Sequence, residues 1–182
     1  DPGAVQQLID ELVQLQLTDA TLYVGYPILS TADESLSLDA ILTSQEHAIV
    51  LFDIRPRLPE DDDEWNLLEE HQAELVIAFK SKLIKHKELT KKRDLIVPIH
   101  VVTFLPDVSH KPETDEEIYL ADRSTVANVI SGLEGVESAL VRPLNAAIQQ
   151  VTTIKPRKRR LNVTNDDSRG GKLKIIEREI AN

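Results

Sequence analysis

Two aspartates and an arginine in the first third of the chain are the residues whose types and spacing could support chemistry. Asp53 and Arg55 lie at the end of an apolar run over 48–54, and Asp39 lies 14 residues before Asp53. If residues 45–47 form the turn of a hairpin, Asp39 falls directly opposite Asp53 with both side chains on one face. Facing carboxylates repel each other unless a cation compensates them. That cation is either a divalent metal bound by carboxylate oxygens or the guanidinium of Arg55.

The elements that must position these side chains are two strands within residues 36–55. The run from Ala48 to Ile54 is apolar except for Asp53, which is typical of a central strand covered on both faces. The stretch 21–29 is rich in β-branched and aromatic residues and predicts a preceding strand, with a bulge or a close approach at Gly25. We therefore expect three strands before the first long helix.

Helices are expected on both sides of this hairpin. The first has apolar residues at helical spacing and ends near Leu17: Val5, Leu8, Ile9, Leu12 and Val13. The second follows the acidic loop 60–64, and Gln72 is the polar exception on its apolar stripe: Trp65, Leu68, Gln72, Leu75, Val76, Phe79 and Leu83. We interpret Gln72 as a core amide bonded to backbone rather than as a cleft residue. The bases over 80–93 either end that helix in solvent or face phosphate.

The second half of the chain predicts further strands and helices. Residues 95–105 are apolar and predict a buried strand, with Pro98 indicating an edge position or a bulge. A short strand is expected over 118–121, followed by a helix over 126–133. Another helix is expected over 140–151, beginning at Pro143.

Composition limits the classes of protein that the chain can represent. Its 182 residues are enough for one domain with a sizeable core. The net charge of −10 argues against a uniformly basic nucleic-acid binder, although bases cluster over 80–93 and 155–160. The absence of Cys excludes disulfides and Cys-based zinc sites and favours a cytoplasmic location. No apolar run approaches the roughly 20 residues of a membrane-spanning helix. The absence of Met indicates a fragment or missing positions.

The element order predicts an α+β (α/β) fold with a mixed central sheet flanked by helices. With its acid positions, this order resembles the restriction-endonuclease-like core of the PD-(D/E)XK nucleases. Asp53, Ile54 and Arg55 match that family's (D/E)-x-K triplet, Asp39 its earlier aspartate and Glu11 its first-helix glutamate. The resemblance implies Asp39, Asp53 and Arg55 as catalytic residues. It also implies Mg²⁺ as a possible cofactor, held by Asp39, Asp53 and Glu11.

Arg55 departs from the family pattern, which has lysine at this position. A guanidinium stays protonated, so it cannot act as a base, and it pairs with carboxylates in competition with a metal. The substitution favours a degenerate site over an active Mg²⁺-dependent nuclease. A purely structural ion pair between Asp53 and Arg55 is the remaining interpretation.

The composition changes after residue 151, which separates a nuclease-like domain over 1–151 from a basic linker and the start of a helix over 152–182. That helix is predicted from Leu173, Ile176 and Ile180. The run 168–182 resembles the segment that joins a nuclease-related N-terminal domain to the motor domain in bacterial superfamily-one (UvrD/Rep-type) helicases. The resemblance implies a motor domain in the same chain as a partner. No P-loop sequence occurs, so ATP hydrolysis by that route is not expected of these residues.

Five bases in the linker are the expected nucleic-acid contacts, through DNA phosphates rather than stacked bases: Lys155, Arg157, Lys158, Arg159 and Arg160. A solvated hinge is the alternative. Three functions remain open on the sequence. They are a catalytically degenerate domain of a DNA helicase that docks nucleic acid or a partner, an active Mg²⁺-dependent nuclease, and a protein-interaction domain without nucleic-acid contact.

Overall fold

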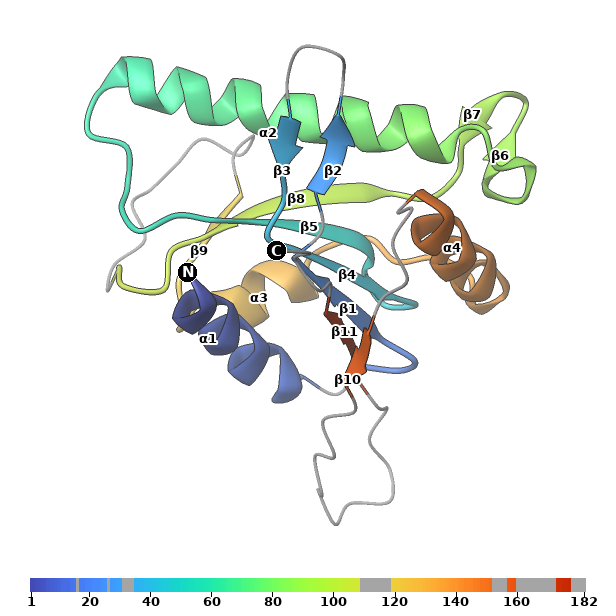
Figure 1. Cartoon of the computed structure of the whole chain (residues 1–182), viewed down its shortest axis with the longest axis horizontal. Coiled ribbons are helices and arrows are strands. Elements are labelled where there is room, and N and C mark those ends of the chain that lie inside the picture. Colours follow the sequence, from blue (N-terminus) through green and yellow to red (C-terminus); the bar gives the residue numbers. More distant parts are fainter. Residues whose placement is uncertain are drawn as a thin grey trace.

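A seven-stranded mixed sheet lies at the centre of the computed structural model (Figure 1). The structure describes residues 1–15, 17–25, 27–30, 35–108, 119–151, 157–159 and 173–177. In order across the sheet, the strands are Arg157–Arg159 (β10), Lys174–Glu177 (β11), Thr21–Val24 (β1), Ala40–Ser44 (β4), Ala48–Ile54 (β5), Ile99–Phe104 (β8) and Leu120–Ala121 (β9). The helices are Pro2–Val13 (α1), Asp62–Leu83 (α2), Val126–Ser131 (α3) and Ser138–Val151 (α4), with a 3-10 turn at Lys87–Leu89 (η1).

Strand directions place several carboxyl ends at one edge of the sheet. The neighbours β1, β4 and β5 are antiparallel, whereas β5, β8 and β9 run parallel, and β11 is parallel to β1. The long helix α2 makes the crossover from β5 to β8 that a parallel pair requires. The carboxyl ends of β1, β5, β8, β9 and β11 therefore lie together at one end of the strands, and we call this end of the sheet the carboxyl edge. The β4–β5 turn lies at the opposite edge.

Helices cover both faces of the sheet, as the sequence predicts (Figure 1). Leu51 and its same-face neighbours pack with α2 and α4, through Leu75 and Leu144. Phe52, on the other face of β5, packs with α1 and α3, through Leu12. Burial of alternate β5 residues on both faces explains the unbroken apolar run. None of the described helices combines the length and the apolar surface needed to cross a bilayer.

The β4–β5 turn contains residues 45–47, as predicted, and is held by a second segment. Strand pairing continues to Ser44 and Ala48, which leaves three residues in the turn. The backbone of Val136 donates a hydrogen bond of 2.9 Å to the carbonyl of Gln45. At Gly135 an added Cβ would lie 2.3 Å from that same carbonyl oxygen, so only glycine permits the approach. The loop before α4 thereby closes this edge of the sheet.

The single strand expected over 21–29 is wrong, because the chain turns at Gly25. Its φ of 74° is in the left-handed region that glycine adopts readily. Strand β1 ends at Val24, and Pro27–Ser30 (β2) pairs instead with Ser35–Ser37 (β3) in a separate two-stranded sheet.

The expected strand over 95–105 and the expected start of the last helix also need correction. Asp94–Leu95 (β7) pairs with Thr90–Lys91 (β6) in a small hairpin, and β8 starts only at Ile99. Pro98 precedes that strand, so it is neither a bulge nor an edge residue of β8. Helix α4 begins at Ser138, and Pro143 lies inside it.

The amphipathic helix expected from Leu173, Ile176 and Ile180 is wrong, because residues 174–177 form strand β11. This strand pairs with β1, whose edge would otherwise be open. Ile175 packs on the α1 face and Ile176 on the α2 face. Burial on both faces at successive positions is typical of a strand. Ile180 lies outside the described residues.

Candidate functional site at the carboxyl edge

Asp39 and Asp53 lie near each other at the carboxyl edge, where the charge of Asp53 acts on Asp39. The β4–β5 pairing ends at Ala40 and Phe52, and Asp39 lies in a bend immediately before β4. Asp53 alternates with Leu51, which packs on the α2 face, so the carboxylate also points to that face. The backbone N–H of Asp39 donates to the carbonyl of Phe52 at 3.2 Å. The paired register ends at Ala40 and Phe52, so direct facing of the two aspartates stays a prediction, although the charge of Asp53 acts on Asp39.

Arg55 binds Asp53 directly. Its Nε donates to Oδ2 of Asp53 at 2.7 Å, and the exposed fractions of the two side chains are 33% and 11%. On the other side, Nε2 of His71 from helix α2 lies 3.8 Å from Oδ1 of Asp53. Asp53 therefore has a permanent cation on one oxygen and a titratable group near the other.

Asp39 is held by the backbone rather than by a cation. Its Oδ2 accepts a hydrogen bond of 2.8 Å from the N–H of Ile54. Burial raises the pKa of Asp39 above its usual value; the bond from Ile54 opposes this effect, and the charge of Asp53 adds to it. The two carboxylates are thus close enough for the charge of Asp53 to disfavour ionisation of Asp39.

The inner wall of the site contains Gln72, whose side-chain nitrogen makes two hydrogen bonds. Its side-chain amide donates to the hydroxyl of Thr103 at 2.8 Å and to the carbonyl of Tyr119 at 3.3 Å. Thr103 is the β8 partner of Asp53. Gln72 therefore joins α2 to two neighbouring strands, which confirms its interpretation as a core amide.

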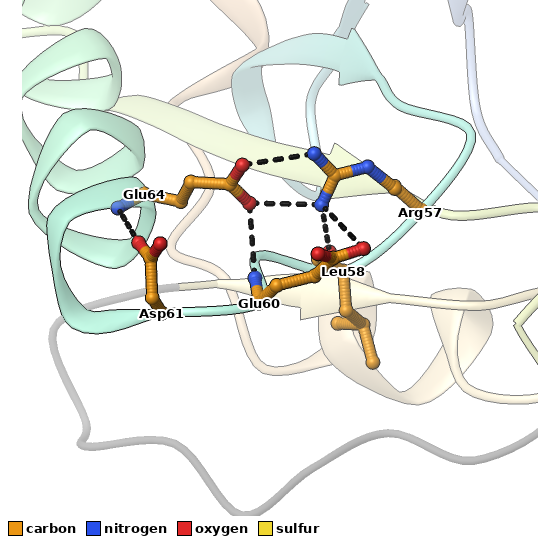
Figure 2. A network of polar contacts seen from close by, with 5 residues as sticks. All are labelled: Arg57, Leu58, Glu60, Asp61 and Glu64. Carbon is orange, nitrogen blue, oxygen red and sulfur yellow. Dashed lines mark hydrogen bonds and ion pairs between the residues drawn. The ribbon is translucent and has the colours of Figure 1, made fainter.

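An exposed ion-pair network lies next along the chain (Figure 2). Both terminal nitrogens of Arg57 donate to the carboxylate of Glu64 at 2.8 Å, and Glu64 also accepts from the N–H of Glu60 at 2.9 Å. Asp61 caps helix α2 by accepting from the N–H of Glu64. The hydrogen bond from Arg57 lowers the pKa of Glu64 to about 2. The bond to Glu64 likewise raises the pKa of Arg57.

A hollow of about 340 Å³ lies between the ion-pair network and the site. Residues 55–59 line it together with Glu64 and Leu67. Leu67 is 61% exposed, so this part of α2 presents an apolar side chain beside the hollow. Arg55 contributes to both the hollow and the site.

Glu11 does not join the two aspartates as a third metal ligand. Its carboxylate pairs with Arg123 at 3.2 Å. Among the described residues, no group of three or more His, Asp or Glu side chains is arranged to hold a metal ion. Because Asp53 is also bound by Arg55, the donor set does not fit the Mg²⁺ ion that the resemblance implies.

The predicted nucleic-acid residues are only partly within the described chain. Lys155 and Arg160 lie outside it, as do the side chains of residues 157–159. The backbone of Arg157, Lys158 and Arg159 forms the edge strand β10, paired with β11. These three positions therefore belong to the sheet rather than to a linker.

Two features of the site were missed in the sequence. His71 follows Leu68 by three residues, a spacing that places it beside the buried stripe of α2. The Asp61 to Glu64 spacing is that of a helix capping box and would have indicated a bonded Glu64. Comparison of the chain with family models, curated proteins and solved structures found no match.

Proposed function

We propose that this chain is the nuclease-like N-terminal domain of a superfamily-one DNA helicase and that it docks nucleic acid without cleaving it. The proposed fold is restriction-endonuclease-like, the proposed partner in the same chain is the helicase motor domain, and the proposed location is the cytoplasm. The element order supports the fold. The main elements occur in the same order as in the nuclease family that the chain resembles: helix α1, the antiparallel strands β1, β4 and β5, the crossover helix α2 and the parallel strand β8.

The observation that carries the proposal is the 2.7 Å bond from Arg55 to Asp53. In an active site of this type, a lysine orients or activates a water bound to the metal. Here the corresponding cation is a guanidinium, which stays protonated and occupies one of the two carboxylates. The other carboxylate, Asp39, accepts from the backbone of Ile54. Charge compensation by Arg55 supports a site that is stable without a metal and does not activate water.

Docking of nucleic acid is supported by the distribution of basic residues. The chain is acidic overall, yet lysines and arginines are concentrated over 80–93 and 155–160. Such clusters bind phosphates electrostatically, and the affinity falls steeply as the salt concentration rises. The resemblance of residues 168–182 to a helicase joining segment adds the expected context, in which a neighbouring motor domain also contacts DNA.

A cleavage assay paired with a binding assay tests the proposal. The chain is incubated with plasmid and linear duplex DNA in the presence of Mg²⁺ or Mn²⁺, and binding is measured separately as salt is varied. We expect salt-dependent binding and no cleavage, and we expect neither metal to raise the melting temperature.

Variants at two positions separate the possible outcomes. Cleavage by the wild type that disappears in Asp53→Ala would establish an active nuclease, and Arg55→Lys should then increase the rate. Absence of binding at low salt would exclude the docking function.

A further inference from the structure

The end of helix α2 and the β6–β7 hairpin form a strongly basic surface. Residues 80–94 contain seven lysines or arginines and two acids, a net charge of +5 with His86 neutral, in a chain whose net charge is −10. We call these seven residues the basic end: Lys80, Lys82, Lys85, Lys87, Lys91, Lys92 and Arg93. Only the bases of the last helical turn complement the helix macrodipole, so the macrodipole does not account for those of the hairpin.

The basic end is exposed and its charges are not compensated. All of its residues except the partly buried Lys82 are exposed. Within the described part of the chain, no acidic side chain forms an ion pair with any of them. Burial, followed by the charge of Lys85, lowers the pKa of Lys82. Crowding of like charges opposes folding, and a bound polyanion would relieve it.

The tip of the hairpin holds two bases in an unfavourable backbone conformation. Lys92 and Arg93 form the two-residue turn between Lys91 and Asp94, with φ of 52° and 72°. Positive φ at both positions is the pattern of a type I′ turn, which Asn-Gly forms with much less strain. The turn therefore has charged residues at two positions where Asn and Gly would cause less backbone strain.

The core fixes the position of this surface. Leu83, Leu89 and Val97 are buried, and the N–H of Ile96 donates to the carbonyl of Leu89 at 2.9 Å, which closes the base of the hairpin. The bases are thus presented on a fixed backbone, so binding has to order only their side chains.

The two ends of α2 have opposite charge. The helix has 22 residues and is therefore about 33 Å long, and five consecutive acids over 60–64 lie at its start, beside the candidate site. The β6–β7 hairpin lies at its far end (Figure 1). A polyanion is repelled near Asp39 and Asp53 and attracted to the basic end.

We propose that the basic end contacts the phosphate backbone of duplex DNA. The inference rests on the docking function proposed above and assigns a surface to it. Residues 80–94 contain no Phe, Tyr or Trp, so they offer no ring on which the bases of a single strand could stack. Contacts limited to phosphates give binding without sequence preference and with a steep dependence on salt.

The double variant Lys92→Asn/Arg93→Gly tests this surface in the full 182-residue chain. It removes two charges and gives the turn the residues that it favours, so it should melt no lower than the wild type. Binding is measured by fluorescence anisotropy with a labelled mixed-sequence duplex of about 20 base pairs, from about 50 to 200 mM salt without divalent metal. We expect binding at least about tenfold weaker at 100 mM salt, and a salt slope smaller by about two.

Two matched controls make the outcomes distinct. Lys92→Arg/Arg93→Lys keeps both charges and should bind as the wild type does, whereas replacement of the four bases at 157–160 by Gln tests the other cluster. A wild type that does not bind near 50 mM salt refutes the docking function itself. A wild type that binds while Lys92→Asn/Arg93→Gly binds equally well overturns only the present assignment. Equally tight binding of polyglutamate peptide in place of DNA would assign the surface to an acidic protein and also overturn it.

Discussion

Arg55 and Arg57 lie two residues apart and each binds a carboxylate, but their surroundings differ. Arg55 reaches a carboxylate whose side chain is 11% exposed and lies near a second aspartate. Arg57 binds Glu64 in water, with exposed fractions of 54% and 36%. The first pair compensates the charge of a carboxylate that lies near Asp39. The second joins the loop after β5 to the first turn of α2.

The pKa values of Asp39, in the site, and of Glu64, in the ion-pair network, are shifted in opposite directions. Burial raises the pKa of Asp39, whereas the hydrogen bond from Arg57 lowers that of Glu64 to about 2. A carboxylate is therefore destabilised in the site and stabilised in the network. A cation at the site relieves an electrostatic cost, whereas a cation in the network adds a local contact.

The largest effect is expected from Arg55→Ala. This change leaves the buried carboxylate of Asp53 near Asp39 with only His71 close by, and the loss of a charged hydrogen bond should lower the free energy of unfolding by about 2 kcal/mol. For a chain of this size that is a fall of roughly 5 °C in melting temperature. Asp53→Asn/Arg55→Ala should recover part of the loss. A loss no larger than that of Arg57→Ala would mean that the two pairs are equivalent.

A smaller effect of opposite sign is expected from Asp39→Asn. The folded pKa lies above the ordinary value of 3.8, so ionisation of Asp39 weakens the fold at neutral pH. Asparagine keeps an oxygen for the N–H of Ile54 and removes the charge. The variant should melt higher than the wild type at pH 7, and the difference should disappear as the pH falls through the folded pKa towards 3.8. Asp107→Asn, on the surface, is the control and should leave melting unchanged; a lower melting temperature for Asp39→Asn at pH 7 contradicts the prediction.

The smallest effect is expected from Glu64→Gln, because an exposed ion pair contributes little and is screened by salt. The folded pKa of about 2 lies below the ordinary value of 4.5, so the contribution of Glu64 is complete above 4.5 and is lost as the pH falls to about 2. Thermal melts across that window should decline less in Glu64→Gln than in the wild type. The surface variant Glu69→Gln should follow the wild type. If the melting temperatures of Glu64→Gln and wild type fall equally with pH, the ion pair does not contribute to stability.

The centre of the site was predictable because strand pairing is local there. Three turn residues and a run of alternating burial were enough to bring Asp39 near Asp53, and the two-residue spacing brought Arg55 to Asp53. His71 was not predicted, since its approach depends on how α2 crosses the sheet. The pairing of Glu11 with Arg123 joins positions 112 residues apart, for which the sequence has no local signal.

The elements with long hydrophobic patterns were predicted correctly, whereas the predictions of several short elements were wrong. Helices α1 and α2 and the central strand β5 agree with their patterns. Strand β11 was read as a helix because Leu173 and Ile176 also suit a helical spacing, and only the open edge of β1 decides between the two. Strand β1 ends early because the φ of Gly25 turns the chain; Gly25 and Pro27 indicated an irregularity here, but not a full break between two sheets.

The parallel pairing of β11 with β1 also determines how the fold would carry mechanical load. Tension applied between the start of β1 and the end of β11 pulls two parallel strands at opposite ends, so all of their hydrogen bonds are sheared together. Tension on the antiparallel β10 and β11 from their joined side would instead separate the bonds one after another. A load applied between these two ends therefore meets the sheet along its more resistant direction.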